Sequence, residues 1–180
     1  MAGRLFAVVG PSGVGKDTLM TAARQARPGL TLVRRVITRP AEAGGEDFES
    51  VTPQVFEARL RNGDFVLHWQ AHGLSYGIPK GVHSVLASGR DALFNGSRAM
   101  LDETARAFPG LHVLHITAKP EVLAERLAAR GRETPDEIRR RLARAPLPLP
   151  EGLSVIEIDN SDPVEQTLPR LLAALDSEKV

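Results

Sequence analysis

The 180-residue chain contains no cysteine. Disulfide bonds, thiolate metal sites and cysteine nucleophiles are therefore excluded, and the composition suits a reducing cytosol. Aromatic residues make up only 4% of a chain that is 42% hydrophobic, so leucine, valine, isoleucine and alanine must form most of the core. The length is that of one domain with a full hydrophobic core.

The sequence also lacks a strong net charge and a long apolar segment. A formal net charge of +1 creates no overall field toward nucleic acid or a membrane, so any anion site must be built locally. No run approaches the roughly 18 apolar residues of a membrane span. The first residues do not resemble a signal peptide, because apolar residues 5–9 lead directly into a glycine-rich turn. We expect a cytoplasmic protein without nucleic-acid or membrane partners, and the oligomeric state, including a homodimer, stays open.

The chain is organised around residues 10–18, GPSGVGKDT. The preceding LFAVV is typical of a strand buried on both faces of a parallel sheet, and the following residues favour a helix. This context fits G-x-x-x-x-G-K, a phosphate-binding P-loop, whose N–H groups and helix N-terminus surround phosphate oxygens while Lys16 reaches the outer phosphates. The predicted nucleotide-binding residues are Gly10, Pro11, Ser12, Gly13, Val14, Gly15, Lys16, Asp17 and Thr18.

Asp17 stands where a P-loop usually has the serine or threonine that binds magnesium, and Thr18 follows one place later. A carboxylate can hold Mg²⁺ directly or through water, which makes Asp17 the candidate metal ligand. An acidic residue in the first helical turn also interacts favourably with the helix dipole. The sequence leaves both roles open.

Apolar segments alternate with helix-forming segments along the rest of the chain. Strands are expected at 30–37, 91–94, 111–117 and 154–158, and helices at 18–26, 98–107, 120–130 and 163–175. The alternation predicts an α/β fold with a parallel sheet flanked by helices and a ligand site at the carboxyl ends of the strands. A loop at 38–50, a helix at 52–61 and a hairpin at 65–78 interrupt it. We expect a single domain with a core at 1–37 and 80–180, an inserted lobe at about 38–79 and an arginine-rich lid at about 130–145.

Two arginine-rich segments suit phosphate binding. Arg35 and Arg39 leave a strand and enter a flexible loop, and arginine binds phosphate in a bidentate manner. Arg130 and Arg141 flank a hinge at Gly131, as a closing phosphoryl-transfer lid requires. Solvated charged surfaces remain the alternative for both segments.

Two further segments carry polar side chains that could line a small-molecule site. The hairpin at 65–78 contains His68, Tyr76 and the single tryptophan. His68 and His72 lack a carboxylate or a further histidine at metal-ligand spacing, so a metal site there is not favoured. Asn95 and Arg98 directly follow a strand, at the expected ligand crevice. Ser97 between them could act only as a helix N-cap.

Together these segments resemble the guanylate kinase-like branch of the nucleoside monophosphate kinases, and within it the ribose 1,5-bisphosphate phosphokinases. The resemblance rests on GPSGVGKDTL, RVITRPAEAGGED, HWQAHGLSYGIP, NGSR and LAARGRE, and it covers essentially the whole chain. It implies a P-loop kinase that uses ATP and Mg²⁺ to make 5-phosphoribosyl 1-pyrophosphate in bacterial phosphonate breakdown. It also implies that the inserted lobe at 38–79 binds the acceptor.

The resemblance implies a phosphosugar acceptor rather than a nucleotide. Leu67, Leu93 and Ile78 stand where guanylate kinases carry two acids and a hydroxyl that read guanine. Polar groups of a guanine left unpaired there would cost roughly 1–3 kcal/mol each. Arg39, Tyr76, Arg130 and Arg141 still match phosphate-handling positions.

The resemblance also assigns roles to the candidate residues. Lys16, Arg130 and Arg141 are the implied catalytic residues, and Asn160, which could also simply begin a helix, is the implied adenine neighbour. The implied substrate-binding residues are Arg35, Arg39, His68, Tyr76, Asn95 and Arg98. A nucleoside monophosphate kinase of altered specificity and a non-catalytic binding module remain alternatives. The intact Gly10, Gly15 and Lys16 argue against the second.

Overall fold

A five-stranded parallel sheet forms the centre of the computed structural model, which describes residues 2–43, 45–143 and 148–177. The strand order is β2-β7-β1-β8-β9, and every neighbouring pair is parallel. The strands are β1 (Leu5–Val9), β2 (Thr31–Leu32), β7 (Ala92–Asn95), β8 (His112–Thr117) and β9 (Ser154–Asp159). The central strand β1 is buried along its whole length, as its uninterrupted apolar sequence predicts. The predicted α/β fold is confirmed.

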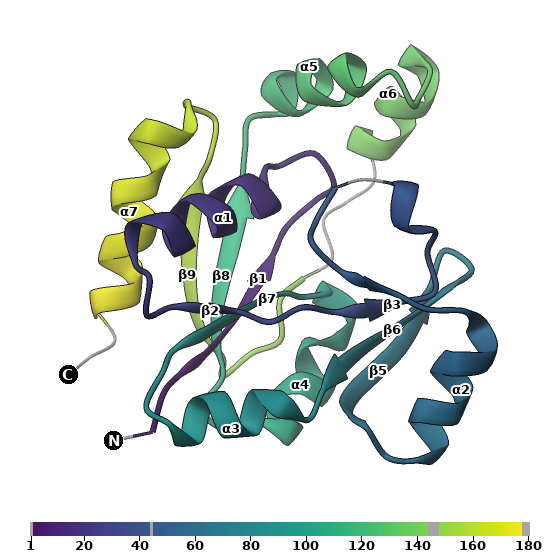
Figure 1. Ribbon diagram of the computed structural model, residues 1–180. Coiled ribbons are helices and arrows are strands. Elements are labelled where there is room, and N and C mark those ends of the chain that lie inside the picture. Colours follow the sequence, from purple (N-terminus) through teal and green to yellow (C-terminus); the bar gives the residue numbers. More distant parts are fainter. Residues whose placement is uncertain (1, 44, 144–147, 178–180) are drawn as a thin grey trace.

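Helices cover both faces of this sheet (Figure 1). Because successive strand residues point to opposite faces, Phe6 and Val8 of β1 pack with the helices on one face, and Leu5, Ala7 and Val9 pack on the other. The first face carries α1 (Lys16–Ala26), α5 (Pro120–Arg130) and α7 (Val164–Ser177), and the second carries α3 (Gly81–Ala87) and α4 (Leu101–Ala107). Among the described residues, no helix is long and apolar enough to cross a membrane.

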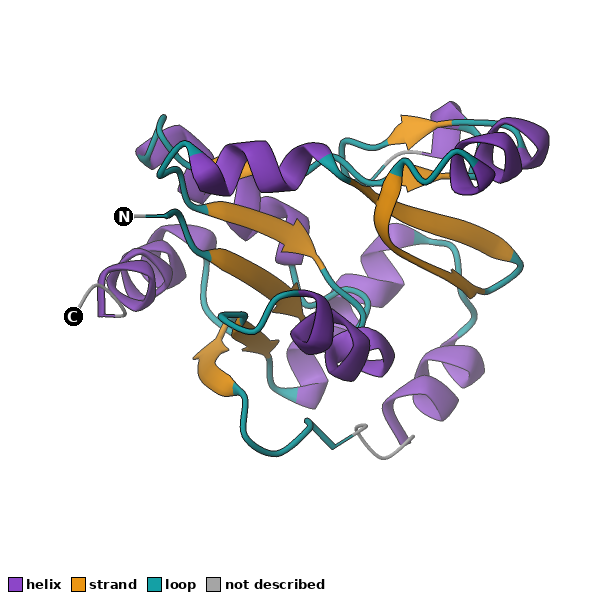
Figure 2. Cartoon of the chain, turned by 90° about the horizontal axis from the view of Figure 1, so that it is seen from below, coloured by secondary structure: helices purple, strands orange, loops and turns teal. Residues whose placement is uncertain are grey.

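A second, mixed sheet lies beside the central one, on the side of the molecule away from both termini (Figure 2). Its order is β4-β3-β6-β5, and α2 (Pro53–Arg61) packs against it through Phe56. The strands are β3 (Val36–Ile37), β4 (Glu49–Ser50), β5 (Phe65–Ala71) and β6 (Leu74–Pro79). Its other face packs on the central sheet through Leu67, Trp69 and Ile78.

The expected strand at 30–37 is wrong as a single element. Thr31 and Leu32 pair with β7 of the central sheet, whereas Val36 and Ile37 pair with β4 and β6 of the second sheet. The chain changes sheets at residues 33–35. The expected loop at 38–50 likewise contains a 3₁₀ turn, η1 (Ala41–Ala43), and ends in β4.

Local signals in the sequence place the helix starts and the hairpin correctly. Thr52 caps α2 by accepting a hydrogen bond from the Val55 N–H group, and Pro53 is the first helical residue. Thr134 and Glu137 form the reciprocal hydrogen bonds of a capping box at the start of α6 (Pro135–Ala143). A turn at residues 72–73 joins β5 to β6. The expected helix at 98–107 begins as a 3₁₀ turn, η2 (Arg98–Met100), before α4.

The expected lid corresponds to the end of α5, a tight turn at Gly131 and α6. Gly131 adopts a left-handed conformation with φ 63°, which ends α5. Figure 1 shows α5 and α6 at the end of the molecule where β1 and β8 end. Residues 144 and 145 of the expected lid lie outside the described residues.

Candidate active site

The glycines of the P-loop are required by its tight path between β1 and α1. Gly15 precedes α1 with φ 96°, and a Cβ atom there would lie 2.6 Å from Asn160 Nδ2. A Cβ atom at Gly10 would lie 2.4 Å from the carbonyl oxygen of Ile116. Both distances are shorter than any real contact, so only glycine allows this loop to pass so close to β8 and to the segment after β9.

Lys16 folds back onto the loop that carries it. Its Nζ atom donates hydrogen bonds to the carbonyl oxygens of Gly10, at 2.8 Å, and Pro11, at 3.2 Å. Burial lowers the pKa of Lys16 to about 8; Asp17 opposes the shift, and Arg35 and Arg98 add to it. A buried ammonium with neighbouring cations is stabilised when an anion binds, so this environment favours a phosphate ligand.

Asn160 and Arg126 hold the P-loop from behind. Asn160 Nδ2 donates to the carbonyl oxygen of Val14 at 2.8 Å, and Arg126 Nη1 donates to the same oxygen at 3.2 Å. The Asn160 side chain is buried, and its Oδ1 atom has no hydrogen-bond partner among the described residues. The residue expected near adenine therefore contacts the phosphate-binding loop itself.

A cavity of about 530 Å³ opens in front of the P-loop. Four separate segments line it: the P-loop with the start of α1, the segment from Arg35 to Glu46, the end of β7 at Asn95 and Gly96, and the end of α5 with the turn after it. The charged residues around it are Lys16, Asp17, Arg35, Arg39, Glu46, Arg130 and Arg132. This concentration of arginine and lysine creates the local anion site that the overall charge of +1 does not reveal.

Most of the expected site residues meet in this cavity. Besides the charged residues, its lining includes Ser12, Gly13, Gly15, Thr18 and Asn95. Arg98 is half-buried, and its charge lowers the pKa of Lys16, which places it near the P-loop. The turn after α5 and the segment from Arg35 to Glu46 also touch directly, because Arg132 Nη2 donates to the carbonyl oxygen of Ala43 at 3.2 Å.

Eight expected site residues lie outside the cavity lining. Gly10, Pro11, Val14 and Asn160 form the P-loop or hold it, and Arg98 lies near it. The other three are His68, Tyr76 and Arg141. His68 is exposed, and it points to the face of the second sheet opposite Tyr76, because Tyr76 pairs with Trp69 directly across the strands. Tyr76 stacks on Trp69 with ring centroids 5.3 Å apart and an interplanar angle of 4°. Arg141 forms an ion pair with Glu133 instead of facing the cavity. The structure therefore does not place His68, Tyr76 and Arg141 in the cavity with the other expected residues.

Arg35 is held by an acidic residue that the sequence did not single out. Its Nε atom donates to Glu46 Oε2 at 2.9 Å, and Nη2 donates to Oε1. The guanidinium carbon also lies 5.1 Å from the ring centroid of Tyr76 and 5.9 Å from that of Trp69. Glu46 and Arg132 are the two charged residues of the cavity lining that the sequence analysis missed. Their segments had been noted, but spacing alone does not show which side chains face inward.

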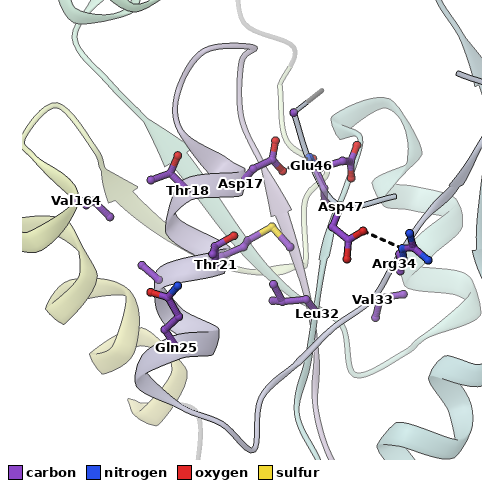
Figure 3. A pocket seen from close by; sticks show the side chains of 14 residues that line it. Asp17, Thr18, Thr21, Gln25, Leu32, Val33, Arg34, Glu46, Asp47 and Val164 are labelled. Atoms are coloured by element: carbon purple, nitrogen blue, oxygen red, sulfur yellow. Dashed lines mark hydrogen bonds and ion pairs between the residues drawn. The ribbon is translucent and has the colours of Figure 1, made fainter. Parts of the chain in front are cut away.

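A second cavity, of about 480 Å³, adjoins the first along α1 (Figure 3). The two share Asp17, Thr18, Gly45, Glu46 and Asn95. Asp17 accepts a hydrogen bond from Asn95 Nδ2 at 3.0 Å. In Figure 3, Thr21 and Gln25 of α1 line one side, and Arg34, which donates to Asp47, lies across from them. The shared residues make one continuous site with a cationic part and a part rich in acidic, amide and hydroxyl groups.

The positions that resemble guanine-reading sites belong to the hydrophobic core. Leu67 and Ile78 are buried in the cluster between the two sheets, and Leu93 is buried in the cluster on the opposite face of the central sheet. They line neither cavity. No polar group at these three positions is available to pair with a nucleotide base.

The fold and the site define a P-loop phosphotransferase. Residues 2–178 match the family model described as guanylate kinase. A ribose 1,5-bisphosphate phosphokinase PhnN from Ruegeria sp. (strain TM1040) is 48% identical over 98% of this chain and 94% of its own length. The enzyme of the same name from Pseudomonas fluorescens (strain SBW25) is 49% identical over 98% of this chain and 96% of its own length.

A solved structure of guanylate kinase from Anaplasma phagocytophilum has the same fold. It superposes with a TM-score of 0.75 at 19% identity, over 99% of this chain and 87% of its own. The chain belongs to the guanylate kinase family and, within it, to the ribose 1,5-bisphosphate phosphokinases.

Proposed function

We propose that the chain transfers the γ-phosphoryl group of ATP to the anomeric phosphate of ribose 1,5-bisphosphate, giving 5-phosphoribosyl 1-pyrophosphate and ADP. The observation that carries the proposal is the cationic cavity in front of the P-loop, which Lys16, Arg39, Arg130 and Arg132 line from three segments. The names of the full-length relatives support the choice of acceptor. We place the reaction in the cytoplasm, in keeping with the absence of cysteine.

No general base is needed for this reaction. The attacking oxygen belongs to a phosphate group whose second pKa is about 6, so it is already ionised near pH 7. Catalysis then depends on positioning the two phosphates and neutralising their charge. The groups that line the cavity suit this task, because its lysine and arginine side chains are hydrogen-bond donors and phosphate oxygens are acceptors only.

Each part of the site has its own role in phosphoryl transfer. The P-loop N–H groups and Lys16 bind the nucleotide phosphates, and Arg39 binds the acceptor phosphate opposite them. Arg130 and Arg132 neutralise the transferring group from the lid, and Arg141 joins them once its ion pair with Glu133 opens. Asn160 serves the nucleotide site through the P-loop, because its amide donates to the Val14 carbonyl oxygen. Tyr76 acts through Arg35, on which it stacks.

Asp17 suits a magnesium ion that is bound mainly by phosphates and water. Asn95 occupies one of its oxygens with a single hydrogen bond, and Asp17 lines both cavities at the start of α1. Among the described residues, no three acidic, histidine or cysteine side chains are grouped to hold a metal unaided. Mg²⁺ commonly takes only one or two carboxylates in kinases. When bound, it supplies charge neutralisation between phosphate oxygens.

A panel of phosphorylated acceptors tests the proposal. Ribose 1,5-bisphosphate, ribose 5-phosphate, GMP and AMP are each incubated with ATP and Mg²⁺, and product masses are recorded with the Lys16→Met variant as a blank. We expect one phosphoryl group to be added to ribose 1,5-bisphosphate on its anomeric phosphate. GMP should be about a thousand-fold poorer in kcat/KM, because two or three lost polar contacts amount to roughly 4 kcal/mol. Preferred use of GMP or AMP would identify a nucleotide kinase instead.

A further inference from the structure

We propose that Glu46 reads the hydroxyl groups of the acceptor's sugar ring and so determines which phosphorylated acceptor is used. The inference rests on the proposed function and names a specificity-determining residue within the same site. Glu46 lines both cavities, at the point where the cationic part meets the part along α1. Figure 3 shows it at the same end of the second cavity as Asp17.

The residues that the structure describes use only part of the hydrogen-bonding capacity of Glu46. A carboxylate has about four acceptor sites, and Arg35 occupies one on each oxygen. The side chain is only 11% exposed, so the remaining sites are directed at a small volume next to the cavities rather than at open solvent. A ligand that offers hydrogen-bond donors there would complete the coordination of this carboxylate.

The distribution of charge separates phosphate groups from hydroxyl groups. Phosphate oxygens are acceptors only, so they are attracted to Lys16, Arg39 and the lid arginines and repelled by Glu46. The second cavity repels phosphate more strongly, because Asp17, Glu46 and Asp47 line it with one arginine, Arg34, which Asp47 already binds. Hydroxyl groups donate hydrogen bonds and suit the carboxylate. The acceptor is therefore oriented with its reacting phosphate toward Lys16 and its ring toward Glu46.

Glu46 is also held rigidly enough to discriminate. The two hydrogen bonds to Arg35 fix the plane of the carboxylate, and Arg35 itself lies over the Tyr76 ring, which stacks on Trp69. A pre-positioned polar group rejects a ligand that lacks its partner, because it is left unpaired when that ligand binds. We expect a preference of about 10- to 100-fold for an acceptor with the hydroxyl over one without it.

Deoxy analogues of the acceptor provide the test. The values of kcat/KM are measured for ribose 1,5-bisphosphate and for its 2-deoxy and 3-deoxy analogues, with wild type, Glu46→Gln and Glu49→Gln. Glu49 is the control, because it also pairs with an arginine, Arg59, but lines neither cavity. Wild type and Glu49→Gln should prefer the ribose compound over at least one analogue by about 10- to 100-fold. Glu46→Gln should reduce that preference to below about threefold while the KM for ATP stays unchanged. The ratio of kcat/KM between the ribose compound and its deoxy analogues separates recognition of the hydroxyl from general damage. Loss of support for Arg35 alone would lower kcat/KM equally for all three acceptors.

An unchanged preference in Glu46→Gln, or no preference in wild type, would overturn the proposal and leave Glu46 as the partner of Arg35. If thermal melting shows that Glu46→Gln does not fold, Glu46→Asp is used instead. It keeps the charge beside Arg35 but withdraws the carboxylate by one methylene, and the preference should again fall.

A binding measurement separates this inference from the proposed function. Trp69 is the single tryptophan and lies beside Tyr76 and Arg35, so its fluorescence reports on this wall of the site. Dissociation constants are measured for ribose 5-phosphate and its 2-deoxy and 3-deoxy analogues, without turnover. A ribose preference that disappears in Glu46→Gln supports the inference even if ribose 1,5-bisphosphate is not phosphorylated. Turnover of ribose 1,5-bisphosphate without any hydroxyl preference refutes the inference alone.

Discussion

Asn160 and Val14 are joined by a 2.8 Å hydrogen bond from the Asn160 amide to the Val14 carbonyl oxygen, across 146 positions of sequence. The bond ties the segment after β9 to the P-loop. Asn160 Nδ2 also lies against Gly15, where a Cβ atom would approach it to 2.6 Å. The shape of the phosphate-binding loop thus depends on a residue from the opposite end of the chain.

Replacing Asn160 should therefore damage both stability and nucleotide binding. We expect Asn160→Ala to lower the free energy of unfolding by about 1–3 kcal/mol, because the buried Val14 carbonyl loses its shorter hydrogen bond. Urea unfolding measures this, and calorimetry with ATP and GTP measures binding. Equal weakening for both nucleotides indicates support of the loop, whereas a loss confined to ATP indicates a contact with adenine. Asp162→Asn, at an exposed ion pair with Arg170, is the control and should change neither property.

Removing the Lys16 charge should abolish turnover but stabilise the protein without nucleotide. Burial lowers the pKa of Lys16 from its ordinary 10.5 to about 8, so the folded state bears the cost of a desolvated charge at pH 7. We expect Lys16→Met to raise the free energy of unfolding by about 1–3 kcal/mol in urea titrations at pH 7.

The same shift predicts the pH dependence of wild type. Between pH 8 and 10.5 the unfolded chain retains the Lys16 proton and the folded chain does not, so this contribution makes stability rise with pH. Lys16→Met should lack that contribution. ATP binding to wild type should weaken above pH 8 and be accompanied by proton uptake, which calorimetry in two buffers detects. If the stability of wild type and Lys16→Met depended on pH in the same way, the lowered pKa of Lys16 would be contradicted.

The lid arginines should act in the transition state more than in ATP binding. Arg130→Ala and Arg132→Ala are each expected to lower kcat by about 100-fold, while the ATP dissociation constant changes little. Arg141→Ala should lower kcat less, because its ion pair with Glu133 must open first. Steady-state kinetics and equilibrium binding give both quantities. Arg139→Ala, which removes an exposed arginine of α6, is the control, and a similar loss there would point to general disruption of the lid.

Asp17 can be assigned by a magnesium titration. We expect Asp17→Ala to raise the Mg²⁺ concentration for half-maximal activity about tenfold, and Asp17→Ser to retain part of the activity, because a hydroxyl can replace the carboxylate as ligand. Asp47→Asn, which alters an exposed acid outside the proposed metal position, should leave the titration unchanged. Unaltered titrations in both Asp17 variants would assign the residue to the helix dipole.

The sequence predicted the central sheet well because each element has a local signature. A local signature is one in which the interacting residues lie only a few positions apart. Examples are the apolar run at 5–9, the P-loop and the helix caps at Thr52 and Thr134. The change of sheets at 33–35 has no such signal, because both halves of 30–37 are extended and apolar. Only the distant partners, β7 for Leu32 and β6 for Ile37, separate them.

The site was predicted by segment more reliably than by side chain. The P-loop, Arg39 and Arg130 meet in one cavity, as expected from their motifs. The inward position of Glu46 depends on its pair with Arg35, which lies eleven residues earlier, and no periodic pattern of the sequence links the two positions. The sequence shows only that Leu67 carries no polar group, and it could not show that this side chain packs in the core.

The route of the chain into and out of the second sheet has a consequence for modular exchange. Residues 33–35 lead into it and Lys80 leads out, so the four strands and α2 form a cassette that could be transplanted between related kinases. The seam of such a chimera would be apolar, since Leu67, Trp69 and Ile78 are shared with the core beneath the central sheet. The entering connection also carries Arg34 and Arg35, so a transplanted cassette would keep its phosphate preference only if the junction lay before residue 34.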